Sequence, residues 1–98
     1  MTEEELQKRE EKLQKKQKEL LEAYKKETYR NPGQFFYYEE GIKAAITQII
    51  SGEKNDPSYL FAQIKKGQFG KLETYEEYNA ALETFSQGFA AMYSYAES

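Results

Sequence analysis

The chain contains no cysteine, no histidine and no tryptophan among its 98 residues. Without thiols it can form no disulfide and offers no thiolate nucleophile. Without imidazole it lacks a common zinc ligand and the side chain that ordinarily titrates near neutral pH. We therefore expect no catalytic residue, no metal site and no cofactor, and we predict that the protein is not an enzyme.

Long apolar runs are also missing, since no stretch approaches the roughly 20 residues that span a bilayer. The N-terminus begins with acidic residues, where a signal peptide would carry positive charge. Together with the absence of cysteine, which suits a reducing compartment, these features predict a cytoplasmic protein without a membrane partner. The net charge of −3 provides no general attraction for nucleic acid.

Strong helix formers dominate the first third of the chain, which is rich in Glu, Lys, Gln and Leu. Thr2 and Glu5 have the spacing of a capping box, and the stretch from Thr2 to about Arg30 has almost no helix breaker. Asn31-Pro32-Gly33 should end this helix, because proline disfavours a helical residue before it. The sequence thus predicts a long charged helix over residues 1–31, followed by a second, three-helix unit over residues 32–98, and the length of the chain indicates that the two form a single domain.

Three further helices are predicted in this second unit. Apolar residues recur at spacings of three and four from about Phe35 to Ser51, and Asp56-Pro57 is a typical start for a short helix to Lys66. The last helix begins at a second capping box, Thr74 with Glu77. Its core stripe comprises Tyr75, Tyr78, Leu82, Phe85, Phe89, Met92 and Ala96. The expected fold class is all-α, with a long coiled-coil-like N-terminal helix and a compact three-helix unit.

A narrow apolar seam runs along the long first helix, and its members are Leu6, Leu13, Leu20 and Tyr24. Polar residues occupy the intervening heptad positions, so the seam can bury little on its own. It could pair with a second copy, serve as an arm for another protein, or fold back on the chain. We favour pairing, and predict a homo-oligomer, most simply a dimer.

Aromatic residues are the compositional anomaly, since nine Tyr and six Phe make up 15% of the chain. By helical geometry Tyr37 points away from the apolar stripe of its helix, and Tyr95 points away from that of the last helix. Such tyrosines supply rigid contact area at binding surfaces, so both are candidate partner contacts. The last helix also carries a stripe of small residues, which either admits a neighbouring helix or contacts a partner: Ala81, Gly88 and Ala91.

One lysine-flanked loop offers an alternative site, with Lys65 and Lys66 before a Gly-x-x-Gly sequence and Lys71 after it. The spacing resembles the clamp loop of KH nucleic-acid-binding domains, but those domains need a β-sheet that this sequence does not predict. The loop also lacks the spacing of a phosphate-binding Walker motif. Phosphate or nucleic-acid binding through these lysines is therefore the less favoured reading.

No motif in the chain specifies a known family. The favoured interpretation is a small protein–protein interaction module that occupies a surface of another macromolecule, as an inhibitor or accessory regulator. Its size, its composition and the missing enzyme parts would suit a regulator from a phage or mobile element. The two alternatives are a binder of nucleic acid or phosphate ligands and a purely structural oligomerisation module.

Overall fold

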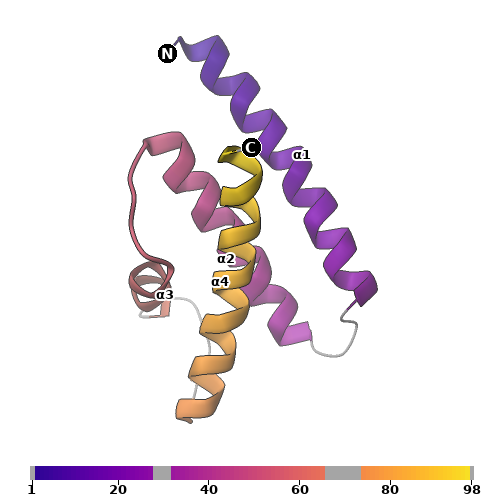
Figure 1. Ribbon diagram of the computed structural model, residues 1–98, viewed down its shortest axis with the longest axis vertical. Helices are drawn as coiled ribbons and strands as arrows, with labels where there is room; N and C mark the ends of the chain where they lie inside the picture. Colours follow the sequence, from indigo (N-terminus) through magenta and orange to yellow (C-terminus); the bar gives the residue numbers. More distant parts are fainter. Residues whose placement is uncertain (1, 28–31, 66–73, 98) are drawn as a thin grey trace.

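Four α-helices make up the computed structural model, which describes residues 2–27, 32–65 and 74–97. They are α1 (Glu3–Glu27), α2 (Pro32–Ser51), α3 (Pro57–Lys65) and α4 (Tyr75–Glu97) (Figure 1). These described ranges contain no β-strand. The all-α prediction is confirmed, including the long N-terminal helix of 25 residues.

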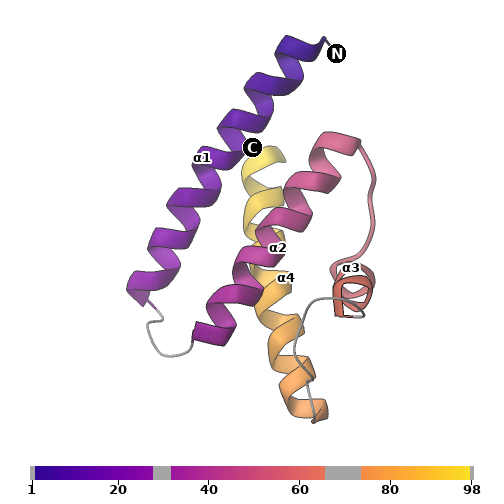
Figure 2. The ribbon, with the colours of Figure 1, turned by 180° about the vertical axis from the view of Figure 1, so that it is seen from behind.

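The arrangement centres on α2 and α4, which cross each other while running in the same general direction (Figures 1 and 2). The antiparallel α1 lies along one side of this pair, and the short α3 lies on the other side. As a result, the C-terminal ends of α2 and α4 lie at one end of the molecule, beside the N-terminal half of α1. The first turns of α1 extend beyond the last turn of α4.

Two glycines allow α2 and α4 to approach closely where they cross. A Cβ added at Gly41 would overlap the carbonyl oxygen of Phe85 and lie 2.9 Å from its carbonyl carbon. A Cβ added at Gly88 would overlap the carbonyl oxygen of Tyr38. Each glycine therefore faces the backbone of the opposite helix, and only a residue without a side chain fits there.

The core consists of two clusters on either side of this crossing. The first joins three helices, because Leu13 of α1 packs with residues of α2 and α4, among them Ile42 and Met92. The second brings Phe61 of α3 against Phe85 and Ala81 of α4. Since Leu13 is only 3% exposed, α1 belongs to the same packed unit as the other helices.

The helix ends follow their sequence signals, with one exception. Thr2 Oγ1 accepts a hydrogen bond from the Glu5 amide at 3.2 Å, and Thr74 Oγ1 accepts one from the Glu77 amide at 3.1 Å, as the capping pattern predicts. Gly52 ends α2 with a φ of 79°. The exception is the start of α2, which lies at Pro32 and not near residue 35. Proline is favoured at the first helical position, where its missing amide hydrogen costs nothing.

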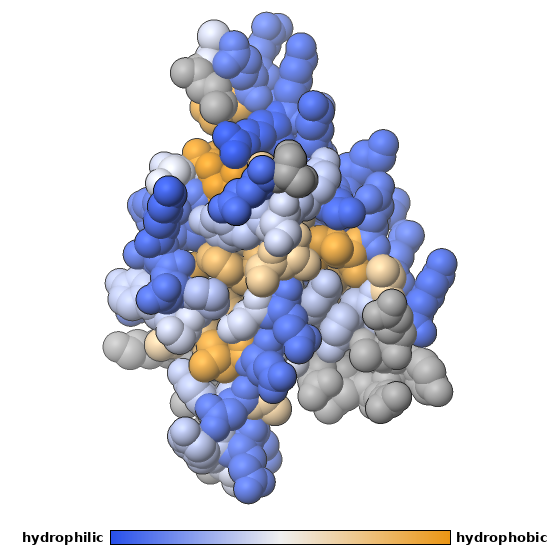
Figure 3. Space-filling model, viewed as in Figure 1, coloured by the Kyte–Doolittle hydropathy of each residue, from blue (hydrophilic) through white to orange (hydrophobic). Residues whose placement is uncertain are grey.

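The surface is divided by chemistry. Hydrophilic side chains cover the outer side of α1, while apolar residues gather over the middle of the molecule, between the helices (Figure 3). Tyr75 departs from the predicted core stripe and is 80% exposed, because the first turn of α4 extends past the elements that cover the rest of the helix. Within the described residues, no helix combines the length and apolar character needed to cross a membrane.

Candidate binding site

The predicted pairing seam of α1 packs against the chain's own helices. Leu13 is buried in the first core cluster, Leu20 packs against that cluster, and the Tyr24 ring stacks on Tyr38 with ring centroids 4.2 Å apart. Leu6 is half-buried. The structure therefore uses most of this seam to fold α1 back, the alternative that we did not favour from the sequence. An amphipathic helix is stabilised by packing its apolar seam against another apolar surface, and α2 and α4 of the same chain provide one.

The small-residue stripe of α4 is likewise largely used within the chain. Ala81 is 3% exposed in the second core cluster, and Gly88 is buried against Tyr38 at the helix crossing. Ala91 is half-buried. This placement corrects the partner role considered for Ala81 and Gly88, because a buried residue contacting α2 is not accessible to another protein.

Tyr37 lies on the side of α2 that α3 covers. Its ring meets that of Phe61 edge-on, with centroids 5.9 Å apart, and it also contacts Phe36. Burial first, and then the negative charge of Glu77, raises the pKa of the Tyr37 phenol above its ordinary value. The helical wheel was right that Tyr37 points away from the apolar stripe, but the opposite side is covered too. Tyr37 is therefore mainly a packing residue.

Tyr95 remains partly accessible, with 37% of its surface exposed near the end of α4. The Lys16 ammonium lies 5.1 Å from the centre of its ring, in cation–π range. Lys16 also pairs with Glu19 at 3.7 Å. Tyr95 thus has one face held by α1 while part of its surface stays available.

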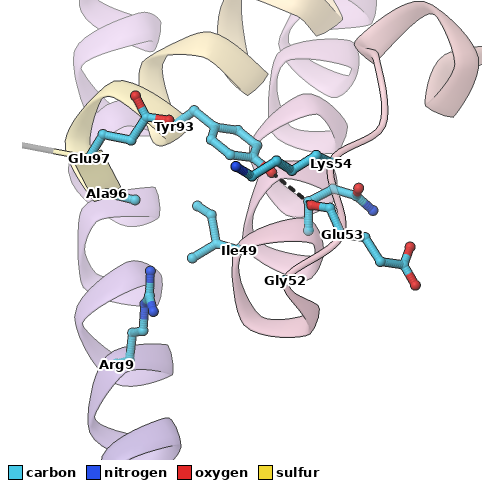
Figure 4. Close-up of a pocket in the computed structure, with 9 residues that line it drawn as sticks. Arg9, Ile49, Gly52, Glu53, Lys54, Tyr93, Ala96 and Glu97 are labelled. Carbon is cyan, nitrogen blue, oxygen red and sulfur yellow. Dashed lines mark hydrogen bonds between the residues drawn. The ribbon is translucent and has the colours of Figure 1, made fainter.

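Two adjoining hollows border this tyrosine at the end of the molecule where α1, α2 and α4 meet. The first has a volume of about 270 Å³ and is lined by Arg9, Lys12, Leu13, Tyr95 and Ala96. The second has a volume of about 170 Å³ and is lined by Arg9, Gln48, Ile49, Gly52, Glu53, Lys54, Tyr93, Ala96 and Glu97 (Figure 4). Because Arg9 and Ala96 line both, we call the two hollows together the α1–α4 trough.

The loop that forms one side of the second hollow is fixed by hydrogen bonds. Gln48 is 5% exposed, and its Oε1 accepts hydrogen bonds from the backbone amide and the side-chain Nδ2 of Asn55, both at 3.1 Å. From α4, the Tyr93 hydroxyl donates to the Glu53 carbonyl at 3.4 Å (Figure 4). The loop after α2 is thereby tied to both α2 and α4, so the hollow has a preformed wall.

Charge in the trough is unevenly distributed. Neither α2 nor α4 has a basic residue in its last turn, although both end here with the negative poles of their dipoles. Positive charge comes instead from Arg9 and Lys12 of α1 and from Lys54 in the loop after α2. The Arg9 side chain extends toward Ala96 (Figure 4). Within the described residues, neither Arg9 nor Lys12 forms an ion pair. On the other side, burial and then Glu97 raise the pKa of the Tyr93 phenol.

The groups in the trough can form hydrogen bonds, ion pairs and aromatic contacts. No cluster of three acidic side chains suited to a metal ion occurs within residues 2–27, 32–65 and 74–97. The groups that line the trough are therefore suited to non-covalent binding of another molecule. Sequence reasoning identified Tyr95 but named neither Arg9 nor Lys12 as a candidate site residue. The signal was present in the three-four spacing of Arg9, Leu13 and Lys16, which places these residues on one side of the helix.

The lysine-flanked loop lies outside the described residues. This applies to Lys66 and Lys71 and to the side chain of Lys65, so the structure gives no geometry for a phosphate site there. Comparison with known proteins adds no assignment: the chain matches no protein-family model, no curated protein and no solved structure.

Proposed function

We propose that this chain is a small non-enzymatic protein-binding module that acts by occupying a surface of another protein. In this proposal it is a stoichiometric inhibitor or accessory regulator, of the kind that phages and mobile elements use. The observation that carries the proposal is the α1–α4 trough, in which the partly exposed Tyr95 lies next to Arg9 and Lys12. Tyrosine and arginine are among the residue types most enriched at energetically dominant interface positions.

The structure of the trough supports this proposal in two further ways. Its walls belong to helices and to a hydrogen-bonded loop, so a partner would lose little free energy in ordering them. Each hollow taken singly is also smaller than the roughly 300–1,000 Å³ of pockets that hold drug-sized ligands. Each hollow therefore suits individual side chains of a protein partner.

The proposal is tested by affinity capture from the native host, with quantitative mass spectrometry. We expect the wild-type chain to retain a specific protein in stoichiometric amount and Tyr95→Ala to retain much less of it. The matched control is Tyr59→Ala, which removes a more exposed tyrosine, 55% accessible, from α3 on the other side of the α2–α4 pair. Equal capture by the wild type and Tyr95→Ala would contradict a binding role for the trough.

Circular dichroism should accompany the capture experiment. Tyr95 is partly exposed, so we expect Tyr95→Ala to keep the helical signal and to unfold at nearly the wild-type temperature. If the variant loses its fold, Lys12→Glu replaces it, because Lys12 is exposed and lines the same hollow. Normal capture by a folded Lys12→Glu variant would count against the proposal.

A further inference from the structure

We infer that the α1–α4 trough recognises an acidic segment of the partner protein, taking a carboxylate side chain between Arg9 and Lys12 beside Tyr95. This inference rests on the proposed function and specifies the chemistry of the partner. Its basis is the composition of the first hollow, where the charged lining residues that the structure describes, Arg9 and Lys12, are both cations. A carboxylate is the protein group that complements them.

Arg9 is the central recognition residue in this inference. It is half-buried, lines both hollows and forms no ion pair with any described carboxylate. A guanidinium presents paired N–H donors that match the two oxygens of a carboxylate. Partial removal from water strengthens such a pair relative to one at a fully exposed position. Lys12, at the exposed edge, adds a second positive charge.

The rest of the hollow suits the apolar part of a partner side chain. Leu13 and Ala96 contribute aliphatic surface, and Tyr95 contributes an aromatic ring whose orientation Lys16 helps to hold. A glutamate side chain has this combination, with methylene groups behind a charged end. A neighbouring apolar side chain of the partner could pack against Tyr95, where aromatic contact area is available.

Protein is favoured over nucleic acid by the charges around the hollow. A nucleic acid brings a phosphate at every nucleotide, and tight binders commonly make about 6–10 phosphate contacts. The trough offers two cations in its first hollow, and the second hollow adds Lys54 but also Glu53, Glu97 and the negative ends of two helices. Those neighbours would repel an extended polyanion, whereas a protein segment can place one or two carboxylates and remain neutral elsewhere.

The test uses the full chain and two synthetic peptides. One is a short fluorescein-labelled peptide of Glu, Leu and Ala, and the other is identical except that Gln replaces every Glu. We expect the Glu peptide to bind in fluorescence anisotropy and the Gln peptide to bind at least about tenfold more weakly, the loss expected for a charge-assisted contact. In NMR spectra of the labelled protein, the shifted amides should belong to the N-terminal half of α1 and the last turns of α4. Equal affinity for the two peptides would overturn the inference.

Charge-removing variants locate the site. Arg9→Gln and Lys12→Gln should each weaken binding of the Glu peptide several-fold. Lys18→Gln makes the same charge change at an exposed position on the side of α1 opposite Arg9 and should leave affinity unchanged. If Arg9→Gln fails to fold, Lys12→Gln still tests the site, because Lys12 is exposed. Equal effects of Lys12→Gln and Lys18→Gln would reveal general charge attraction and overturn the assigned site.

Two outcomes separate this inference from the proposed function. If the Glu peptide fails to bind while capture from the host still depends on Tyr95, the acidic-segment inference is wrong and the protein-binding function stands. If Tyr95→Ala also captures as much protein from the host as the wild type does, both the inference and the proposed function are wrong. A short DNA duplex that binds at these α1 residues, with affinity falling steeply as salt increases, would replace the inferred partner with nucleic acid.

Discussion

The closest approach of α2 and α4 gives the sharpest test of the packing, through the substitution Gly88→Ala. The added methyl would meet the Tyr38 carbonyl, and Ile42 Cγ1 would lie 3.4 Å away. A backbone carbonyl inside a helix cannot rotate aside, so the helices would have to separate at the crossing. Separation weakens the dispersion contacts of the core residues next to it.

The magnitude follows from two opposing terms. Overpacking a close-packed core costs about 1–3 kcal/mol, and an immovable obstacle places this site at the upper limit, about 3 kcal/mol. Replacing a helix-interior glycine with alanine returns about 1 kcal/mol of helix propensity. We therefore expect Gly88→Ala to lower the free energy of unfolding by about 2 kcal/mol. For a domain of this size, the melting temperature should fall by about 8–16 °C.

Thermal and urea unfolding followed by circular dichroism measure this change. Ala90→Gly, at an exposed position of the same helix, is the matched control for the propensity term and should cost about 1 kcal/mol. Gly41→Ala should be at least as damaging as Gly88→Ala, and the double variant should cost less than the sum, because one separation relieves both overlaps. A Gly88→Ala chain as stable as the wild type would refute the close approach of α2 and α4.

Three other substitutions or conditions test separate parts of the fold. Leu13→Ala should cost about 2–4 kcal/mol in urea unfolding, because it opens a cavity where α1 joins the core; a negligible cost would mean that α1 does not pack there. Gly52→Ala should cost about 1 kcal/mol through its φ of 79° alone, since an added Cβ would have no neighbour within 4 Å, and Gly52→Asn should cost less. The raised pKa of Tyr37 means that the folded chain keeps a proton that the unfolded chain loses near pH 10, so stability should be constant below about pH 9 and decline as the pH rises through the raised folded value. Phenolate absorbance and urea unfolding across this range should show a weaker decline for Tyr37→Phe, and an identical decline would contradict the assignment.

Local structure was largely readable from the sequence, because helix ends and helix faces depend on nearby residues. The caps at Thr2 and Thr74, the stop at Gly52 and the burial of Phe85 and Met92 all agree with the pattern. The start of α2 was placed late because Pro32 was read as a terminator of the preceding helix. Proline fits both roles, and local sequence alone does not distinguish them.

The packing of one helix against another was harder to predict. A periodic apolar stripe shows which side of a helix is buried, but it does not show which element buries it. The α1 seam was assigned to a second copy, yet Leu13 and Tyr24 pack within the chain. Tyr37 was predicted to be an accessible partner contact, and α3 covers it. Arg9 was missed at the candidate site, because its importance arises only where α1 passes the ends of α2 and α4.

The parallel course of α2 and α4 has a consequence for synthesis on the ribosome. Parallel neighbours cannot be joined by a tight turn, so more than twenty residues separate the end of α2 from the start of α4. While these residues emerge, α1 and α2 can form a local hairpin, but Ile42 still lacks the α4 surface that buries it. Such long-range pairing slows folding relative to a simple up-and-down bundle. The nascent chain therefore exposes the apolar, isoleucine-rich surface of α2, which is prone to aggregation, until α4 has been made.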